Sequence, residues 1–154
     1  MVLVRSVSPR TRLPLDRLRR VARLTLNALG CSGADLHLMV VDDREIRRLN
    51  RRFLGKNRPT DVLAFGVDVE EEGRAPLLGE IVISWETARR QARRLGHSLE
   101  EELSLLTIHG LLHLVGYDDS DPTESRLMHE RERSLFIKFV GKPSPGLWNG
   151  LLPA

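Results

Sequence analysis

The sequence predicts one domain built from alternating strands and helices. Its 154 residues are the usual size of a single compact domain with a sizeable core. Four segments have the short apolar pattern of strands, and five have helical periodicity or a helix-capping signal. Neither a repeat nor a low-complexity segment interrupts this order. We therefore expect an α+β fold in which about four strands form a small sheet and about five helices pack with it.

Four apolar segments bounded by turn residues predict the strands. The first has the pattern of an edge strand. The last two are separated by an acidic, glycine-containing loop (DVEEEGR, 68–74), which we expect to be exposed and mobile. The predicted strands are 1–7 (MVLVRSV), 35–43 (DLHLMVVDD), 62–65 (VLAF) and 77–84 (LLGEIVIS).

Helix starts are predicted mainly from side chains that satisfy free backbone N–H groups. The first helix is predicted at 15–29, which has apolar residues at helical spacing and stops before Gly30. The second runs from the capping box of Asp42 and Glu45 to about Phe53, the third follows Ser84, and the fourth runs from the capping box of Ser98 and Glu101 to near Gly116. The last helix starts with Asp121 as its cap, Pro122 at the first helical position and Glu124 at the third. The segment from 141 onward (GKPSPGLWNGLLPA) is dense in proline and glycine, so we expect a loosely ordered tail.

Cysteine content and hydropathy indicate the cellular compartment. Cys31 is the only cysteine, and no apolar run suited to a signal peptide follows the first charged residues. The longest apolar stretch, 103–116, is too short to span a bilayer and contains two histidines. We expect a cytoplasmic protein with no membrane role.

Basic residues are mostly arginine and fall in three clusters, at 9–23, 44–52 and 88–94. Guanidinium groups pair with phosphate in a bidentate way, so such clusters are typical of a surface that faces nucleic acid. The net charge is only +3, however, and arginine usage also follows genome composition. The clusters therefore allow two interpretations, an RNA-binding surface or an ordinary solvated one.

Two histidines on one predicted helix are the first candidates for chemistry. His109 and His113 are four residues apart, so both imidazoles can face a single cation, and a third ligand can come from the aspartates of YDDSD after Gly116. On the spacing alone, ordinary histidines of a buried helix remain the more common case. Gly110 occupies the position where zinc peptidases carry their glutamate base, which counts against a peptidase. A glycine inside a helix also suggests that something approaches closely there.

Three sequence blocks together resemble the YbeY family of bacterial endoribonucleases that mature ribosomal RNA. HGLLHLVGYDD at 109–119 is similar to the family signature H-G-x-L-H-L-x-G-Y-D-H. NRRFLGKNRPTDVLAF at 50–65 is similar to N-x-x-Y-R-x-K-D-x-P-T-D-V-L-S-F, and LLGEIVIS at 77–84 to L-G-D-I-V-I-S. The resemblance covers about 36–140 and keeps the family's order. It is far more specific than the histidine pair.

The resemblance implies a zincin-like α+β fold, with a small mixed sheet and the histidine helix beneath it. It further implies a metal-dependent endoribonuclease specific for single strands, which acts in maturation of small-subunit ribosomal RNA and in ribosome quality control. The usual metal is zinc, without an organic cofactor, and the partners are ribosomal RNA and the small ribosomal subunit. On this basis one domain spans 1–154, with metal ligands His109, His113 and Asp119.

Two departures from the family pattern fall at the expected site. Asp119 stands where the family has its third metal histidine; a carboxylate is a legitimate zinc ligand, although it lowers the net charge and shifts preference toward oxygen-loving metals such as manganese. Leu54 replaces an arginine thought to contact the substrate phosphate, and Arg52 and Arg58 are the nearby candidates for that role. Ala64 replaces a serine.

The other polar residues of the motifs have simpler expected roles. Asp121 is expected to cap the last helix, and Asp118 to make either a turn contact or a hydrogen bond to a ligand. His129 is expected at the surface and is the reserve third ligand. Lys56, Thr60 and Asp61 match the family block, and Thr60 and Asp61 are expected to order its loop more than to touch RNA. His37 and His97 are expected to be structural or solvated.

Two rival functions remain from other classes. A non-catalytic ribosome-associated or RNA-binding protein would keep the fold and the basic surface but lose hydrolysis through Asp119 and Leu54. A metallopeptidase ranks third because of Gly110.

Overall fold

The computed structural model describes residues 1–7, 11–66 and 77–149, and it contains the four strands and five helices expected from the sequence. The elements are β1 (Val2–Ser6), α1 (Leu15–Ala28), β2 (Asp35–Val41), α2 (Asp43–Leu54), β3 (Val62–Gly66), β4 (Leu77–Ser84), α3 (Trp85–Leu95), α4 (Leu99–Leu114), α5 (Pro122–Phe139) and a 3₁₀ turn, η1 (Leu147–Asn149). The acidic loop expected to be mobile lies outside the described residues.

The strands form one mixed sheet in the order β1-β2-β4-β3. β1, β2 and β4 are parallel, and β3 runs antiparallel to β4 at one edge. Two parallel strands that are neighbours in a sheet need a long crossover connection. Helix α1 connects β1 to β2, and α2 followed by β3 connects β2 to β4. The α+β class and the mixed sheet are thereby confirmed.

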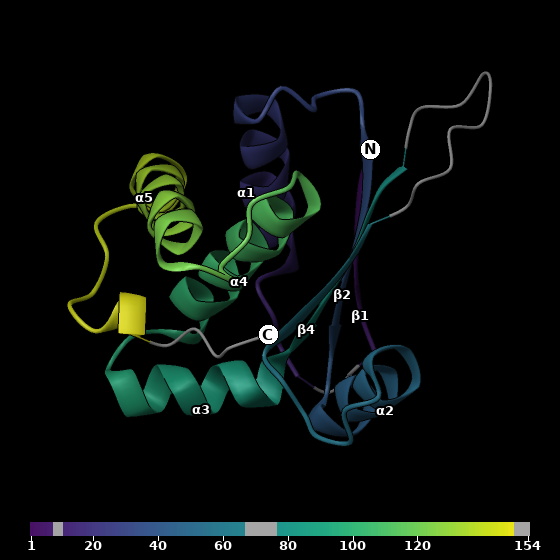
Figure 1. Cartoon of the computed structure of the whole chain (residues 1–154). Coiled ribbons are helices and arrows are strands. Elements are labelled where there is room, and N and C mark those ends of the chain that lie inside the picture. The colour runs from purple at the N-terminus through teal and green to yellow at the C-terminus, as the bar shows by residue number, and fades with distance from the viewer. Residues whose placement is uncertain (8–10, 67–76, 150–154) are drawn as a thin grey trace.

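Helices cover both faces of the sheet, and alternation along the strands explains why (Figure 1). Leu36, Leu38 and Val40 of β2 belong to the cluster that includes residues of α1 and α4. The other face packs against α2, chiefly through Ile46. Figure 1 shows α2 alone on that side, with α1, α4 and α5 on the other.

Helix α4 lies at the centre of the molecule and is buried on all sides along most of its length. It is buried almost continuously from Glu102 to Leu112 because the sheet covers one side while α1, α3 and α5 pack around the rest. A Cβ added to Gly110 would lie 3.0 Å from Cγ2 of Ile81, so the close approach suggested by this glycine is confirmed. In the part of the chain that is described, none of the helices has the length and apolar character needed to cross a bilayer.

The predicted caps mostly form as expected. Ser98 and Glu101 make a complete capping box at the start of α4. Asp121 accepts hydrogen bonds from two backbone N–H groups of α5, both at 2.9 Å. At α2 only half of the predicted box forms: Asp42 accepts from the Glu45 N–H at 2.8 Å, but the Glu45 carboxylate turns to Arg48 instead. An ion pair with arginine is the stronger option for that carboxylate.

The C-terminal segment packs against the body as far as Trp148, in contrast to the loosely ordered tail we expected. Leu147 is fully buried, and the Trp148 ring meets Phe136 edge-on at 5.4 Å. Ser144 donates from its N–H and its hydroxyl to Glu101, at 3.1 and 2.9 Å. The prediction of a loose tail relied on proline and glycine content, which does not reveal these individual packing contacts. Residues 150–154 lie outside the described part.

We expect Gly79→Ala to destabilise the protein by about 1–3 kcal/mol, the range typical of overpacking a tight site. An added Cβ would lie 2.3 Å from the Phe65 carbonyl oxygen and 2.8 Å from Leu114 Cδ2. The backbone oxygen cannot move away without disturbing the β3–β4 pairing. Chemical denaturation measures the change. Gly33→Ala is the control, because nothing lies within 4 Å of its Cβ position; equal effects at both positions would contradict this explanation.

Candidate metal centre

Three of the predicted ligands converge at the C-terminal end of α4. His109, His113 and Asp119 each present one ligand atom, and these atoms lie within 4.8 Å of one another. The two Nε2 atoms face each other at 3.0 Å, and the rings meet edge-on with centroids 4.6 Å apart. His109 is buried, while His113 and Asp119 are partly exposed. Solvent therefore reaches the group at His113 and Asp119.

The turn after α4 brings Asp119 back toward the two histidines. Gly116 has a φ of +103°, its N–H donates to the His113 carbonyl, and the Tyr117 N–H donates to the Leu112 carbonyl. These two bonds form a Schellman motif, which reverses the chain at a helix end. The Asp118 carboxylate then accepts from the backbone N–H of Asp119 at 2.7 Å, which is a contact within the turn.

Glu132 of α5 holds His109 from behind. Its Oε1 lies 2.6 Å from Nδ1 of His109, and both side chains are almost fully buried. A carboxylate that accepts a hydrogen bond from Nδ1 fixes the proton on that nitrogen. The lone pair of Nε2 is then free to face the space between His109, His113 and Asp119, where a metal ion would bind. No sequence motif predicts the contact between Glu132 and His109. The available signal was its position four residues from both Met128 and Phe136, where a buried stripe should be apolar.

The two imidazoles have opposite shifts in pKa. Burial alone would lower the pKa of His109, but the hydrogen bond and charge of Glu132 outweigh it and raise that pKa above its ordinary value. Burial, together with the neighbouring His109, lowers the pKa of His113. His113 is therefore held in the neutral form that binds metal ions.

The donor set fits a catalytic type of zinc site. Two imidazole nitrogens and one carboxylate oxygen leave a fourth position open for substrate or water, whereas structural zinc sites use four protein ligands. Zinc–nitrogen bonds of 2.0–2.1 Å in tetrahedral geometry imply ligand nitrogens about 3.3 Å apart. The two Nε2 atoms, at 3.0 Å, need to separate by only a few tenths of an ångström.

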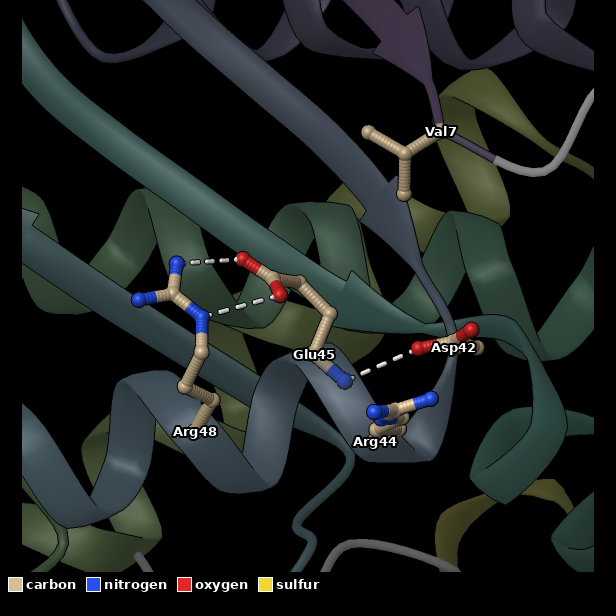
Figure 2. Close-up of a pocket in the computed structure, with 5 residues that line it drawn as sticks. All are labelled: Val7, Asp42, Arg44, Glu45 and Arg48. Atoms are coloured by element: carbon tan, nitrogen blue, oxygen red, sulfur yellow. Dashed lines mark hydrogen bonds and ion pairs between the residues drawn. The ribbon is translucent and has the colours of Figure 1, made fainter.

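A surface hollow at the start of α2 has none of these properties. It is lined by Val7, Asp42, Arg44, Glu45 and Arg48 (Figure 2). Figure 2 shows that the carboxylates in it are already engaged, Glu45 with Arg48 and Asp42 with the Glu45 N–H. The candidate centre is therefore the α4 group.

A family profile described as Endoribonuclease YbeY matches residues 10–140. The chain belongs to the YbeY endoribonuclease family.

Individual relatives agree with this assignment to the YbeY family. Endoribonuclease YbeY of Aquifex aeolicus is 45% identical over 124 residues, which are 80% of this chain and 82% of the relative. That of Bacillus licheniformis is 35% identical over 152 residues, covering 90% and 96%. The solution structure of TM1509 from Thermotoga maritima superimposes with a TM-score of 0.66 at 28% identity, covering 95% of this chain and 99% of that one.

Leu54, which replaces an arginine of the YbeY pattern, lies at the end of α2, on the sheet face opposite α4. Leu54 ends α2 with 52% of its surface exposed. Arg52 and Arg58 are exposed as well, and the Arg52 guanidinium lies over the Phe53 ring. Within the described residues, neither arginine has a polar contact with the His109 group. Their role toward a substrate phosphate stays a prediction.

A buried network of hydrogen bonds links the polar side chains from Asp61 to His97. Asp61 accepts from the Val62 N–H at 2.8 Å and from Gln91 at 3.4 Å, so it orders its loop as expected. Gln91 also donates to Glu102 at 3.0 Å, and Glu102 pairs with His97. Burial raises the pKa of Glu102 despite the opposing effect of His97.

The remaining histidines lie outside the group of three. His97 is fully buried in that network, whereas His37 is 40% exposed and faces Glu80. His129 is also at the surface, with Nδ1 3.2 Å from the second oxygen of Glu132. Since Asp119 already completes the group of three, the reserve ligand is not needed.

Proposed function

We propose that this protein is a metal-dependent endoribonuclease that cleaves single-stranded RNA. The observation that carries the proposal is the convergence of His109, His113 and Asp119 around one point with an open fourth position. Family membership selects RNA as the substrate. We further propose zinc as the metal, small-subunit ribosomal RNA as the physiological substrate, the small ribosomal subunit as partner and the cytoplasm as location.

Each residue of the site has a defined part in this proposal. When bound, the metal supplies Lewis acidity toward the phosphodiester and activation of water. Glu132 orients His109, and His113 offers a neutral imidazole because its pKa is lowered. Asp119 adds a negative charge, which lowers the net charge of the centre relative to a third histidine. Arg52 or Arg58 would contact the phosphate that the missing arginine contacts elsewhere in the family.

The test combines metal content with strand-specific cleavage. Purified protein is analysed for bound metal, and cleavage is compared for one RNA as a single strand and as a duplex, with chelator and after zinc is restored. We expect metal near one equivalent and cleavage of the single strand only, lost with chelator and regained with zinc. RNA binding without cleavage under any metal would favour the non-catalytic RNA-binding alternative, which the exposed Leu54 supports.

Restoring the family residues should increase activity. Asp119→His replaces an anionic ligand by a neutral one, so cleavage should rise or its pH optimum should move downward. If Leu54 is the larger deficit, Asp119→His combined with Leu54→Arg should exceed the product of the two single effects, because both groups serve one transition state. Cleavage rate against pH for all four proteins measures this. A wild type as fast as the double variant, with the same optimum, would show that neither departure matters.

Asp119→Asn should weaken metal binding, because it removes the anionic oxygen ligand. Asp118→Asn is the matched control: it removes one charge from the adjacent position, while the asparagine oxygen can still accept from the Asp119 N–H. Zinc titration of both variants measures the difference. Equal losses would mean that only the local charge matters and that Asp119 is not a ligand.

A further inference from the structure

An aromatic side chain stands exposed at the end of α2. Phe53 has 56% of its surface exposed, although phenylalanine is usually buried. The ring is not loose, because it lies 5.4 Å from the Phe65 ring of β3 at an angle of 58°. Phe65 in turn packs against the buried cluster under α2. The sheet therefore supports Phe53 from one side while another part of its surface faces solvent.

Positive charge surrounds this ring. The Arg52 guanidinium carbon lies 5.3 Å from the centre of the Phe53 ring. No acidic residue occurs between 46 and 60. Arg48 pairs with Glu45, and Arg47 donates to Asn57. In the described structure the other cations of this stretch have no carboxylate partner; they are Arg51, Arg52, Lys56 and Arg58.

The ring lies near the same edge of the sheet as the metal centre. β3 is the edge strand, and it contacts α4. The Phe65 carbonyl and the Leu114 side chain both lie where a Cβ on Gly79 of β4 would be, so they are close to each other. Leu114 follows His113 in the chain. A strand passing over the exposed edge of β3 would therefore meet Phe53 on one face of the sheet and the metal centre on the other.

We propose that Phe53, supported by Phe65 and flanked by Arg52, is a stacking platform for an unpaired base of the RNA substrate. The inference rests on the proposed function. An aromatic face binds any base of a single strand, and the surrounding guanidinium groups pair with its phosphates. A duplex keeps its bases stacked inside and cannot use the ring. The platform thus gives a physical reason for preferring single strands. The stretch 46–60 carries arginines and a lysine but no acidic residue, which favours a polyanion over a basic protein partner.

Binding is tested in chelator, so that no RNA is cleaved, with an oligouridylate and an abasic ribose–phosphate oligomer of equal length. Phe53→Ala should weaken oligouridylate binding roughly 5- to 150-fold, the loss typical for one base–aromatic stack. It should not change binding of the abasic oligomer. Phe53→Trp should retain affinity, and Phe53→Leu, which still packs on Phe65, should lose it. Ile137→Ala on α5 is the control, because Ile137 is also 56% exposed and apolar.

Salt dependence separates stacking from charge. Phe53→Ala should leave the slope of log K against log salt unchanged, whereas Arg52→Gln should reduce its magnitude by about 0.7, the value for one phosphate contact on a single strand. Unchanged oligouridylate binding by Phe53→Ala, or an equal loss on both oligomers, would overturn the platform. Cleavage with zinc is measured separately: an active enzyme with normal Phe53→Ala binding refutes only the platform, and an inactive protein with a stacking defect refutes only the nuclease.

Discussion

Replacing His113 by alanine should abolish RNA cleavage and lower zinc affinity by more than roughly 100-fold, because loss of a ligand's hydrogen-bonding partner alone typically costs 10- to 100-fold. His113 is the better of the two histidines to remove. It is partly exposed, whereas His109 is buried against Glu132. Losing His109 would break the buried pair with Glu132 and leave only the exposed His129 beside that carboxylate; breaking a buried pair typically destabilises a protein by about 3–5 kcal/mol.

Zinc titration and single-strand cleavage measure the effect of His113→Ala, and thermal unfolding of the metal-free protein shows whether the fold survives. His37→Ala is the matched control, since His37 is also a partly exposed histidine but lies on β2 beside Glu80. We expect the control to bind zinc and cleave like the wild type. Full zinc binding by His113→Ala would remove this residue from the ligand set.

Glu132→Gln should reduce zinc affinity by about 10- to 100-fold, although Glu132 is not a ligand. Glutamine can accept the same hydrogen bond from His109 but carries no charge. It therefore fixes the ring less firmly and makes Nε2 a weaker donor. Glu124→Gln, at an exposed position of the same helix, is the control. Unchanged affinity in Glu132→Gln would mean that the buried ion pair serves the fold and not the centre.

Glu132→Gln should also change how the free energy of unfolding depends on pH, and this effect can be measured without metal. Glu132 raises the pKa of His109 in the folded protein, so protonated His109 contributes stability. That contribution is complete below the ordinary imidazole pKa of about 6.5 and disappears as the pH rises through the higher folded value. Glu132→Gln should therefore lose more free energy of unfolding below pH 6.5 than above it. Denaturation of metal-free protein across this range measures the difference, and a uniform loss would contradict the assigned cause.

Local signals explain why much of the fold could be predicted. Ser98 with Glu101, and Asp121 with Pro122, mark helix starts through contacts within one turn, and such contacts depend little on the rest of the chain. The sheet order and the half-formed box at α2 depend on partners distant in space or on competition from Arg48. Sequence patterns do not encode these partners.

The candidate site divides in the same way. His109 and His113 are set by helix geometry, and Asp119 by the reversal at Gly116. Glu132 was missed because it joins the site only when α5 packs on α4, across 23 residues of sequence. The sequence predicts only that a helix ends near Phe53. The exposure of its ring depends on where α2 lies against β3. Residues brought in by tertiary packing are thus the ones that sequence reasoning did not find.

The C-terminal segment also determines when α4 can complete its packing during synthesis. Ser144 completes the polar contacts of Glu101 at the start of α4, and Leu147 closes the apolar cluster between α4 and α5. Glu132 reaches His109 only after α5 has been made. A nascent chain that has emerged only to Asp119 therefore has all three ligands but an uncovered apolar helix and an unsupported His109. We expect chains that end prematurely in this region to aggregate, because the apolar surface of α4 stays uncovered.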